Sequence, residues 1–119
     1  MRRAIVATAF LIASTPAHAD EVRLDDDQII AALSDQTAIY TDGEVYQYFD
    51  PNGQTPYWDR GRLTRGSWTV NGGRYCSTWP PSTGVSCYEV FSNDADEIIW
   101  IGARGDRYVA TMVDGNKLP

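Results

Sequence analysis

The chain has 119 residues, a formal net charge of −6 at pH 7 and one histidine. This length suits one small domain with a single core and leaves no room for a second domain. The acidic balance argues against nucleic acid or anionic lipid as a partner, because both are bound through basic protein surfaces. We therefore expect one acidic domain whose surface favours a neutral or cationic partner.

The first nineteen residues, 1–19, have the pattern of an export signal. Arg2-Arg3 forms a basic start, residues 4–13 are apolar, and Ala17-His18-Ala19 has the small-x-small form of a signal-peptidase site. We expect cleavage after this site, a single mature domain of residues 20–119, and a periplasmic or secreted location. The apolar run is shorter than the roughly 20 residues of a membrane helix, and no later stretch approaches that length. No membrane-spanning segment is predicted.

Cleavage would remove the only histidine, His18, with two of the ten basic residues and none of the sixteen acidic ones, so the mature charge would be −8. Without an imidazole, a Ser-His or Cys-His catalytic pair is impossible, and zinc, copper and haem lose their commonest protein ligand. We expect a protein that is not an enzyme and that holds no cofactor or metal. Catalysis by carboxylates alone is the alternative, with these candidate residues: Asp42, Glu44, Asp50, Asp59 and Glu89.

A helix is predicted over about residues 25–35. Asp25 can cap its N-terminus, and Gln28 stands three residues later, as in a capping box. The spacing of the apolar residues gives this helix one apolar face. That face consists of Ile29, Ile30 and Leu33.

After the helix, short segments rich in Tyr, Trp, Val, Ile and Thr alternate with turn residues, which is typical of antiparallel strands. Asp42-Gly43 is a type I′ hairpin signal, and Asn71-Gly72-Gly73 marks another turn. The pattern predicts an all-β fold: a small antiparallel meander closed into a barrel of about eight strands, with a sandwich as the alternative. The expected strands are residues 37–41, 44–49, 55–59, 62–70, 74–79, 85–91, 97–103 and 107–113.

The two cysteines lie on neighbouring predicted strands. In an oxidising compartment we expect one disulfide, Cys76–Cys87, while a two-cysteine metal site is the less favoured alternative. A turn centred on residues 81–82 places the two cysteines directly opposite each other, close enough for a disulfide. Because side chains alternate along a strand, the disulfide is predicted on the outer face. The residues predicted to point inward are Tyr75, Trp79, Tyr88 and Val90.

The segment Ile98-Ile99-Trp100-Ile101 is apolar on both faces of its strand, so both faces need cover. We expect the barrel core to cover one face and the apolar face of the helix to cover the other.

Aromatic residues are in excess and occur on nearly every predicted strand. They suit a pocket for a small hydrophobic, sugar or cationic ligand, because each offers a flat face and some a polar tip. An ordinary aromatic core is the alternative. Tyr57 and Trp58, beside Pro56 and Gly61, are the best candidates for exposed recognition residues. The candidate ligand-binding residues are Tyr48, Tyr57, Trp58, Trp68 and Trp79.

Two further patterns have weak functional readings. Asp94, Asp96 and Glu97 carry oxygen ligands that suit calcium, but the segment lacks the spacing and glycine of an EF-hand loop, so a solvated turn is predicted. Arg104-Gly105-Asp106 spells an adhesion tripeptide and is predicted to be a hairpin turn.

Four motifs follow one another in a recurring order: Tyr48-Phe49-Asp50-Pro51-Asn52-Gly53, Gly66-Ser67-Trp68, Tyr75-Cys76-Ser77-Thr78-Trp79 and Cys87-Tyr88. The set resembles families of small exported proteobacterial proteins of unknown function with a lipocalin-like (calycin-like) β-barrel. The similarity covers about residues 38–113. Gly66-x-Trp68 is also similar to the lipocalin Gly-x-Trp signature, although it lies mid-chain instead of on the first strand. The resemblance implies a barrel and a periplasmic location, and it brings no catalytic residue.

Two functions from different classes fit these features. The first is a non-enzymatic binding module that holds a small ligand or an envelope component in an aromatic-lined barrel mouth. The second is an inhibitor or accessory protein of a periplasmic enzyme. The position of Tyr57 and Trp58 discriminates between them, because a cavity lining favours the first and an exposed rim favours a protein partner.

Overall fold

The computed structural model describes residues 20–40 and 43–119. The predicted export signal and the predicted turn residue Asp42 lie outside the described residues. In the part of the chain that is described, no helix is long and apolar enough to cross a membrane.

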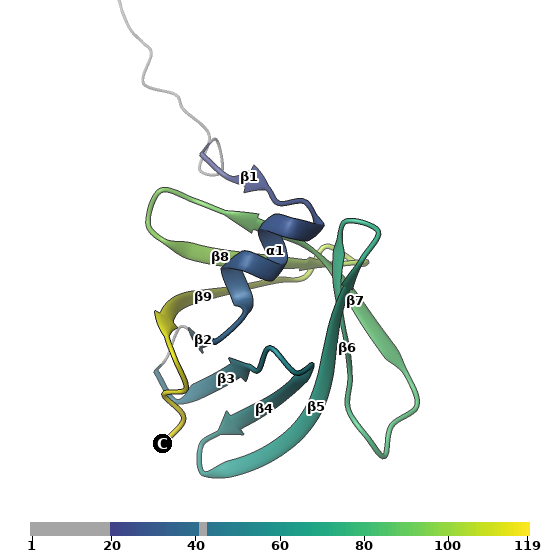
Figure 1. Ribbon diagram of the computed structural model, residues 1–119, viewed down its shortest axis with the longest axis vertical. Helices are drawn as coiled ribbons and strands as arrows, with labels where there is room; N and C mark the ends of the chain where they lie inside the picture. Colours follow the sequence, from purple (N-terminus) through teal and green to yellow (C-terminus); the bar gives the residue numbers. More distant parts are fainter. Residues whose placement is uncertain (1–19, 41–42) are drawn as a thin grey trace, which may run out of the picture.

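Nine strands of the described residues form one antiparallel sheet (Figure 1). Strands β2 to β9 pair in chain order, and β9 also pairs with β2, so that these eight strands close into a barrel. The short β1 adds to β7 from outside this meander. The barrel predicted from the alternating pattern is therefore confirmed. The strands are β1 (Val22–Arg23), β2 (Gln36–Tyr40), β3 (Val45–Phe49), β4 (Gln54–Asp59), β5 (Arg62–Asn71), β6 (Arg74–Thr78), β7 (Val85–Ser92), β8 (Glu97–Gly102) and β9 (Arg107–Asp114).

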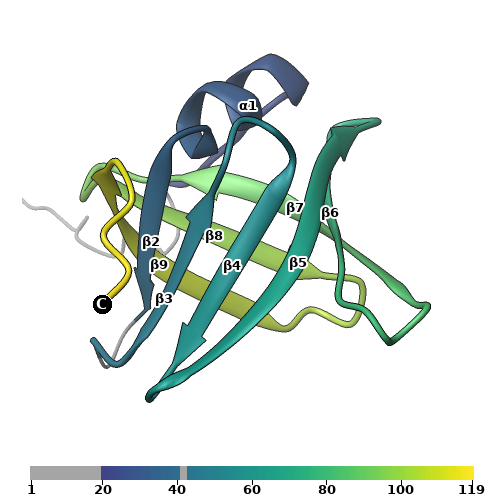
Figure 2. The same cartoon turned by 60° about the horizontal axis from the view of Figure 1, so that its bottom comes forward.

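The meander gives the barrel two different ends. Because every strand reverses direction, alternate turns lie at the same end. The turns β4–β5, β6–β7 and β8–β9 surround one end, and the turns β3–β4 and β5–β6 lie at the other, next to α1 (Figure 2). The first end is open and is called the mouth below.

Helix α1 (Asp26–Leu33) begins with the predicted capping box. The Gln28 amide donates to Asp25 Oδ1 over 2.9 Å, and the Asp25 amide donates to Gln28 Oε1 over 2.9 Å. These two bonds satisfy amides that the first helical turn leaves without intrahelical partners. The helix ends two residues earlier than predicted, because Ser34 has extended backbone and Asp35 turns the chain with φ of 59°.

The position predicted for the helix is wrong. It packs against β5, β2 and β6 at the closed end, not on the outer face of β8. Ile29 and Leu33 are fully buried in the core with inward-facing residues such as Phe49 and Trp68, whereas Ile30 is 44% exposed. Residues four apart share one stripe of a helix, so Ile29 and Leu33 together close the barrel end and Ile30 points elsewhere.

The cysteine hairpin has the predicted register. Cys76 pairs directly with Cys87, and the disulfide joins Cα atoms 4.0 Å apart. Of the four residues predicted to point inward, Tyr75 and Val90 belong to the buried core, and Trp79 and Tyr88 line the cavity described below.

Candidate functional site: an aromatic cavity at the barrel mouth

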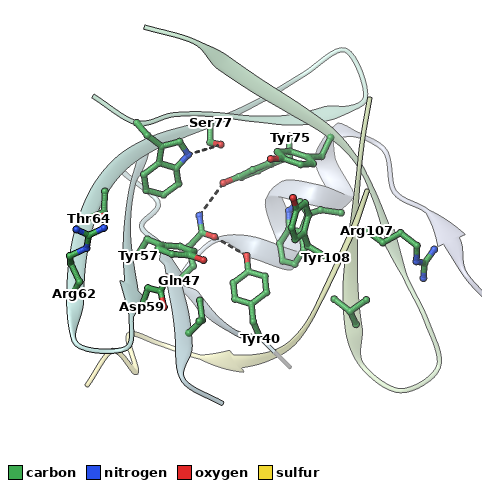
Figure 3. Close-up of a pocket in the computed structure, with 15 residues that line it drawn as sticks. Tyr40, Gln47, Tyr57, Asp59, Arg62, Thr64, Tyr75, Ser77, Arg107 and Tyr108 are labelled. Atoms are coloured by element: carbon green, nitrogen blue, oxygen red, sulfur yellow. Dashed lines mark hydrogen bonds between the residues drawn. The ribbon is translucent and has the colours of Figure 1, made fainter. Parts of the chain in front are cut away.

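A cavity of about 660 Å³ opens at the mouth of the barrel (Figure 3). Its walls come mainly from alternate, inward-facing positions of the strands, and aromatic side chains are the commonest kind in the lining. Helix α1 covers the opposite end of the barrel, so the cavity opens in one direction. The aromatic residues that line it are Tyr40, Tyr57, Tyr75, Trp79, Tyr88, Trp100 and Tyr108.

The rings of the wall hold one another in place. Tyr57 and Trp79 meet edge to face, with ring centroids 5.7 Å apart and planes at 75°. The ring of Tyr88 meets that of Tyr108 edge to face, with centroids 6.0 Å apart. It meets the ring of Tyr75 at a tilt, with centroids 6.1 Å apart. Such pairs contribute about 0.5–1.5 kcal/mol each beyond the area they bury. The wall is therefore a preformed surface and needs no rearrangement to offer ring faces and edges.

Gly66 on β5 makes room for the Trp79 indole. A Cβ atom at position 66 would lie 2.5 Å from Trp79 Cε3 and 2.7 Å from the Thr78 carbonyl oxygen, both closer than van der Waals contact allows. Only glycine lets the indole lie directly on the β5 backbone. The glycine of the Gly66-Ser67-Trp68 motif thus has a packing role at the cavity wall.

A chain of hydrogen bonds runs across the inner part of the cavity and centres on Gln47 (Figure 3). The Gln47 amide nitrogen donates to Thr55 Oγ1 over 2.9 Å and to the Tyr75 hydroxyl over 3.2 Å. The Gln47 amide oxygen accepts from the Tyr40 hydroxyl over 2.8 Å. Gln47 is 5% exposed, and its amide is satisfied within the protein, as a buried amide must be.

The charged groups of the lining lie at the mouth. Asp59 forms an ion pair with Arg60 at 2.6 Å. Arg107 donates through its two terminal guanidinium nitrogens to the two carboxylate oxygens of Glu21. Figure 3 shows Arg107 pointing away from the cavity. Arg62 is exposed and forms no ion pair with the residues that the structure describes. The inner part of the cavity therefore carries no permanent charge.

Three tyrosines of the wall, Tyr40, Tyr75 and Tyr108, are neutral at pH 7. Burial raises the pKa of Tyr40 and of Tyr75 well above the usual value of a phenol. A hydrogen bond to Asp106 raises the pKa of Tyr108. Their hydroxyl groups keep their protons and can serve both as donors and as acceptors.

The structure brings two of the five predicted ligand-binding residues, Tyr57 and Trp79, together in the cavity wall. Trp58 follows Tyr57 on β4 and so points outward, where it pairs with Tyr46 and Leu63 on the adjacent strands. The positions of these two residues distinguish a small-ligand binding module from a protein inhibitor. Tyr57 lines the cavity and Trp58 does not.

The other two predicted residues lie outside the cavity. The Tyr48 hydroxyl donates to Asp35 over 2.6 Å, which raises the pKa of Tyr48 to about 12. Trp68 points inward but near the closed end, where it contacts Phe49 and donates its indole N–H to the Asp50 carbonyl over 2.9 Å. Both have structural partners in the described fold.

Several lining residues were not among the predicted site residues. They share one feature: each points to the inside of the barrel, as Tyr57 does, from one of the other strands. Strand alternation, counted from the Tyr75 and Tyr88 pair, was the signal that could have found them. These residues are Tyr40, Gln47, Arg62, Tyr75, Tyr88, Trp100 and Tyr108.

The acidic candidates are dispersed. Of the four carboxylates considered for catalysis that the structure describes, Asp59 alone lines the cavity, and Asp42 lies outside the described residues. In the β7–β8 turn, Asn93 accepts from the amides of Ala95 and Glu97, so side-chain capping organises this segment. Among the described residues, no group of three or more His, Cys, Asp or Glu could hold a metal ion.

Comparison with family models, with curated proteins and with solved structures finds no match to this chain. The closed eight-stranded antiparallel barrel agrees with the fold that the sequence resemblance implies. The candidate site therefore rests on the geometry of the cavity and on the chemistry of its lining.

Proposed function

We propose that the protein is an exported, non-enzymatic binding module that holds a small ligand in the mouth of its barrel. The observation that carries this proposal is the aromatic cavity of about 660 Å³, open at the mouth and covered by α1 at the other end. Sites for small molecules are concave, mostly apolar, and about 300–1,000 Å³ in volume. The pattern of residues 1–19 and the Cys76–Cys87 disulfide support export.

The lining favours a ligand with a flat, uncharged body. Aromatic side chains are the commonest in the lining, and away from the charged groups at the mouth the groups able to orient a ligand are hydroxyls and one amide. A fully charged group would lose its hydration in this environment without gaining an ion pair. A free small molecule, or the end of an envelope component, would enter by the mouth past Asp59 and Arg62.

The binding proposal can be tested with the uncharged fluorescent dye N-phenyl-1-naphthylamine and the oxidised protein. Saturable binding is expected, and Trp79→Ala should weaken it about tenfold or more, because it removes a large apolar surface from the wall. Trp58→Ala is the matched control, since this tryptophan lies on the outer face of β4 and does not line the cavity. Absence of saturable binding, or equal loss in both variants, would contradict the proposal.

A second observation favours the alternative, an inhibitor or accessory protein of a periplasmic enzyme. An apolar row crosses the outer face of β2 to β5, with each member paired to the next across the strands. Leu63 at its end is 43% exposed. Exposed apolar patches are typical of protein interfaces. The members of this row are Ile39, Tyr46, Trp58 and Leu63.

The same two variants separate the functions. If the protein acts through the outer row, Trp58→Ala should abolish co-purification of a defined periplasmic enzyme and restore that enzyme's activity, whereas Trp79→Ala should do neither. If it acts through the cavity, a native mass spectrum of the protein taken unreduced from the periplasm should show a small-molecule adduct. That adduct should be lost in Trp79→Ala.

A further inference from the structure

The direction of each hydrogen bond around Gln47 is set by Thr55. The Thr55 hydroxyl donates its only proton to the Tyr48 carbonyl oxygen over 2.8 Å, so its oxygen can only accept the contact from Gln47. The Gln47 Nε2 atom therefore faces Thr55 and Tyr75, and Oε1 faces Tyr40. No other orientation of the amide satisfies these contacts.

This orientation leaves an acceptor at Tyr40. The Tyr40 hydroxyl must give its proton to Gln47 Oε1, because that atom has none to donate. The Tyr40 oxygen keeps its lone pairs, and no donor among the described residues occupies them. The half-buried Tyr40 lines the cavity, so this acceptor is at the cavity surface.

The neighbouring pair, Tyr75 and Ser77, leaves a donor. The Tyr75 oxygen accepts from Gln47 Nε2, and Ser77 Oγ accepts from Trp79 Nε1 over 3.1 Å. Neither hydroxyl has an acceptor for its own proton among the described residues. The pair can therefore donate to a ligand from either residue.

The donor and the acceptor flank the same amide, on residues that are largely buried and that line the cavity. Tyr75 is 3% exposed and Ser77 is 5% exposed. A hydroxyl group is the simplest chemical group that accepts one hydrogen bond and donates another. A carboxylate could use the donor but would face the Tyr40 lone pairs, and an ammonium group could use the acceptor but would face the spare proton.

From this we infer that the cavity selects a ligand carrying a hydroxyl group at the inner end of a flat, apolar body. The inference names the substrate class of the proposed binding function and rests on that function. The hydroxyl accepts from the Tyr75–Ser77 pair and donates to Tyr40, while the body lies against the rings of Tyr57 and Trp79. A sugar ring fits less well, because the Gln47 cluster offers donors only from the Tyr75–Ser77 pair and an acceptor only from Tyr40, whereas a sugar carries hydroxyls all around its ring.

Three probes of the same shape test this inference: 2-naphthol, 2-methoxynaphthalene and naphthalene. The first can accept and donate, the second can only accept, and the third does neither. Titration calorimetry with the oxidised mature protein at pH 7 should give affinities in that order, each step about 2- to 10-fold, as one hydrogen bond contributes.

Two variants test which residues cause each difference in affinity between the probes. Tyr40→Phe should remove most of the preference for 2-naphthol over 2-methoxynaphthalene. The double variant Tyr75→Phe, Ser77→Ala should remove most of the preference for 2-methoxynaphthalene over naphthalene, and both residues are changed because either can supply the proton. Tyr46→Phe is the matched control, since Tyr46 lies on the outer face of β3 and does not line the cavity, and it should preserve the wild-type order.

The outcomes distinguish failure of the inference from failure of the proposed function. If all three probes bind wild-type protein equally well, the cavity binds small molecules but does not select a hydroxyl, and the inference is overturned alone. Tighter binding of methyl β-glucoside than of 2-naphthol would overturn it in the same way. If none of the molecules binds, the inference and the proposed function both fail.

Discussion

Truncation of Leu33 tests whether α1 closes the barrel. Leu33 is fully buried at the closed end, in the same core cluster as Phe49, Trp68 and Trp100. Leu33→Ala removes three carbon atoms, and at about 0.8 kcal/mol for each buried carbon the lost transfer free energy is roughly 2.5 kcal/mol. The space left behind raises the expected loss to about 3–4 kcal/mol, because the neighbouring rings can only partly fill it.

Urea unfolding followed by tryptophan fluorescence measures this loss. We expect a lower midpoint with an unchanged slope, and a melting temperature lower by about 10–20 °C, as expected for a domain of this size. The matched control is Ile30→Ala on the same helix, where the side chain is 44% exposed and the change should be within about 0.5 kcal/mol. Equal effects of the two substitutions would refute the placement of Leu33 at the centre of the closure.

Three further results are expected. Asp25→Ala should lower the free energy of unfolding by about 1 kcal/mol through loss of the capping box, whereas the first-turn control Asp27→Ala should cost less than half as much; equal losses would contradict the cap. Replacing Cys76 and Cys87 by Ser should cost about 3 kcal/mol in urea unfolding and leave dye affinity within about twofold, because the disulfide does not line the cavity; a large loss of affinity would contradict this placement. The pKa of Tyr48 is about 12 in the folded protein and about 10 when unfolded, so its stabilisation is complete below pH 10 and is lost as the pH rises through 12. Urea unfolding from pH 9 to 11.5 should therefore show a shallower decline in Tyr48→Phe than in the wild type, and parallel curves would refute the assignment.

The cavity was partly predictable, and the reason lies in the cysteine hairpin. Two cysteines opposite each other set the register of β6 and β7, and alternation then places Tyr75 and Tyr88 on the inner face. No comparable reference exists for β3 and β4, where aromatic residues stand at adjacent positions. Tyr57 and Trp58 are equivalent by composition, yet one lines the cavity and the other points outward.

The position of each tryptophan along the barrel axis was the second property that the sequence could not predict. Trp68 and Trp79 both belong to the inner side of the β5–β6 region, but Trp68 lies near the closed end beside Phe49 and Trp79 lies in the cavity wall. The helix decides this difference, because it fills one end of the barrel with Ile29 and Leu33. Helical spacing predicts that these two residues share a face but does not predict which surface they cover.

The sequence by itself determined the local structure of this protein. Alternating β-formers, turn residues and a capping box specify the eight strands of the barrel and the start of the helix, because these features depend on neighbours within a few residues. The tertiary structure alone decided which end of the barrel is closed and how Gln47 is oriented between Tyr40 and Tyr75. Those properties depend on packing between residues far apart in the chain, and the hydrogen-bonding capacity of the cavity arises only once the barrel has closed.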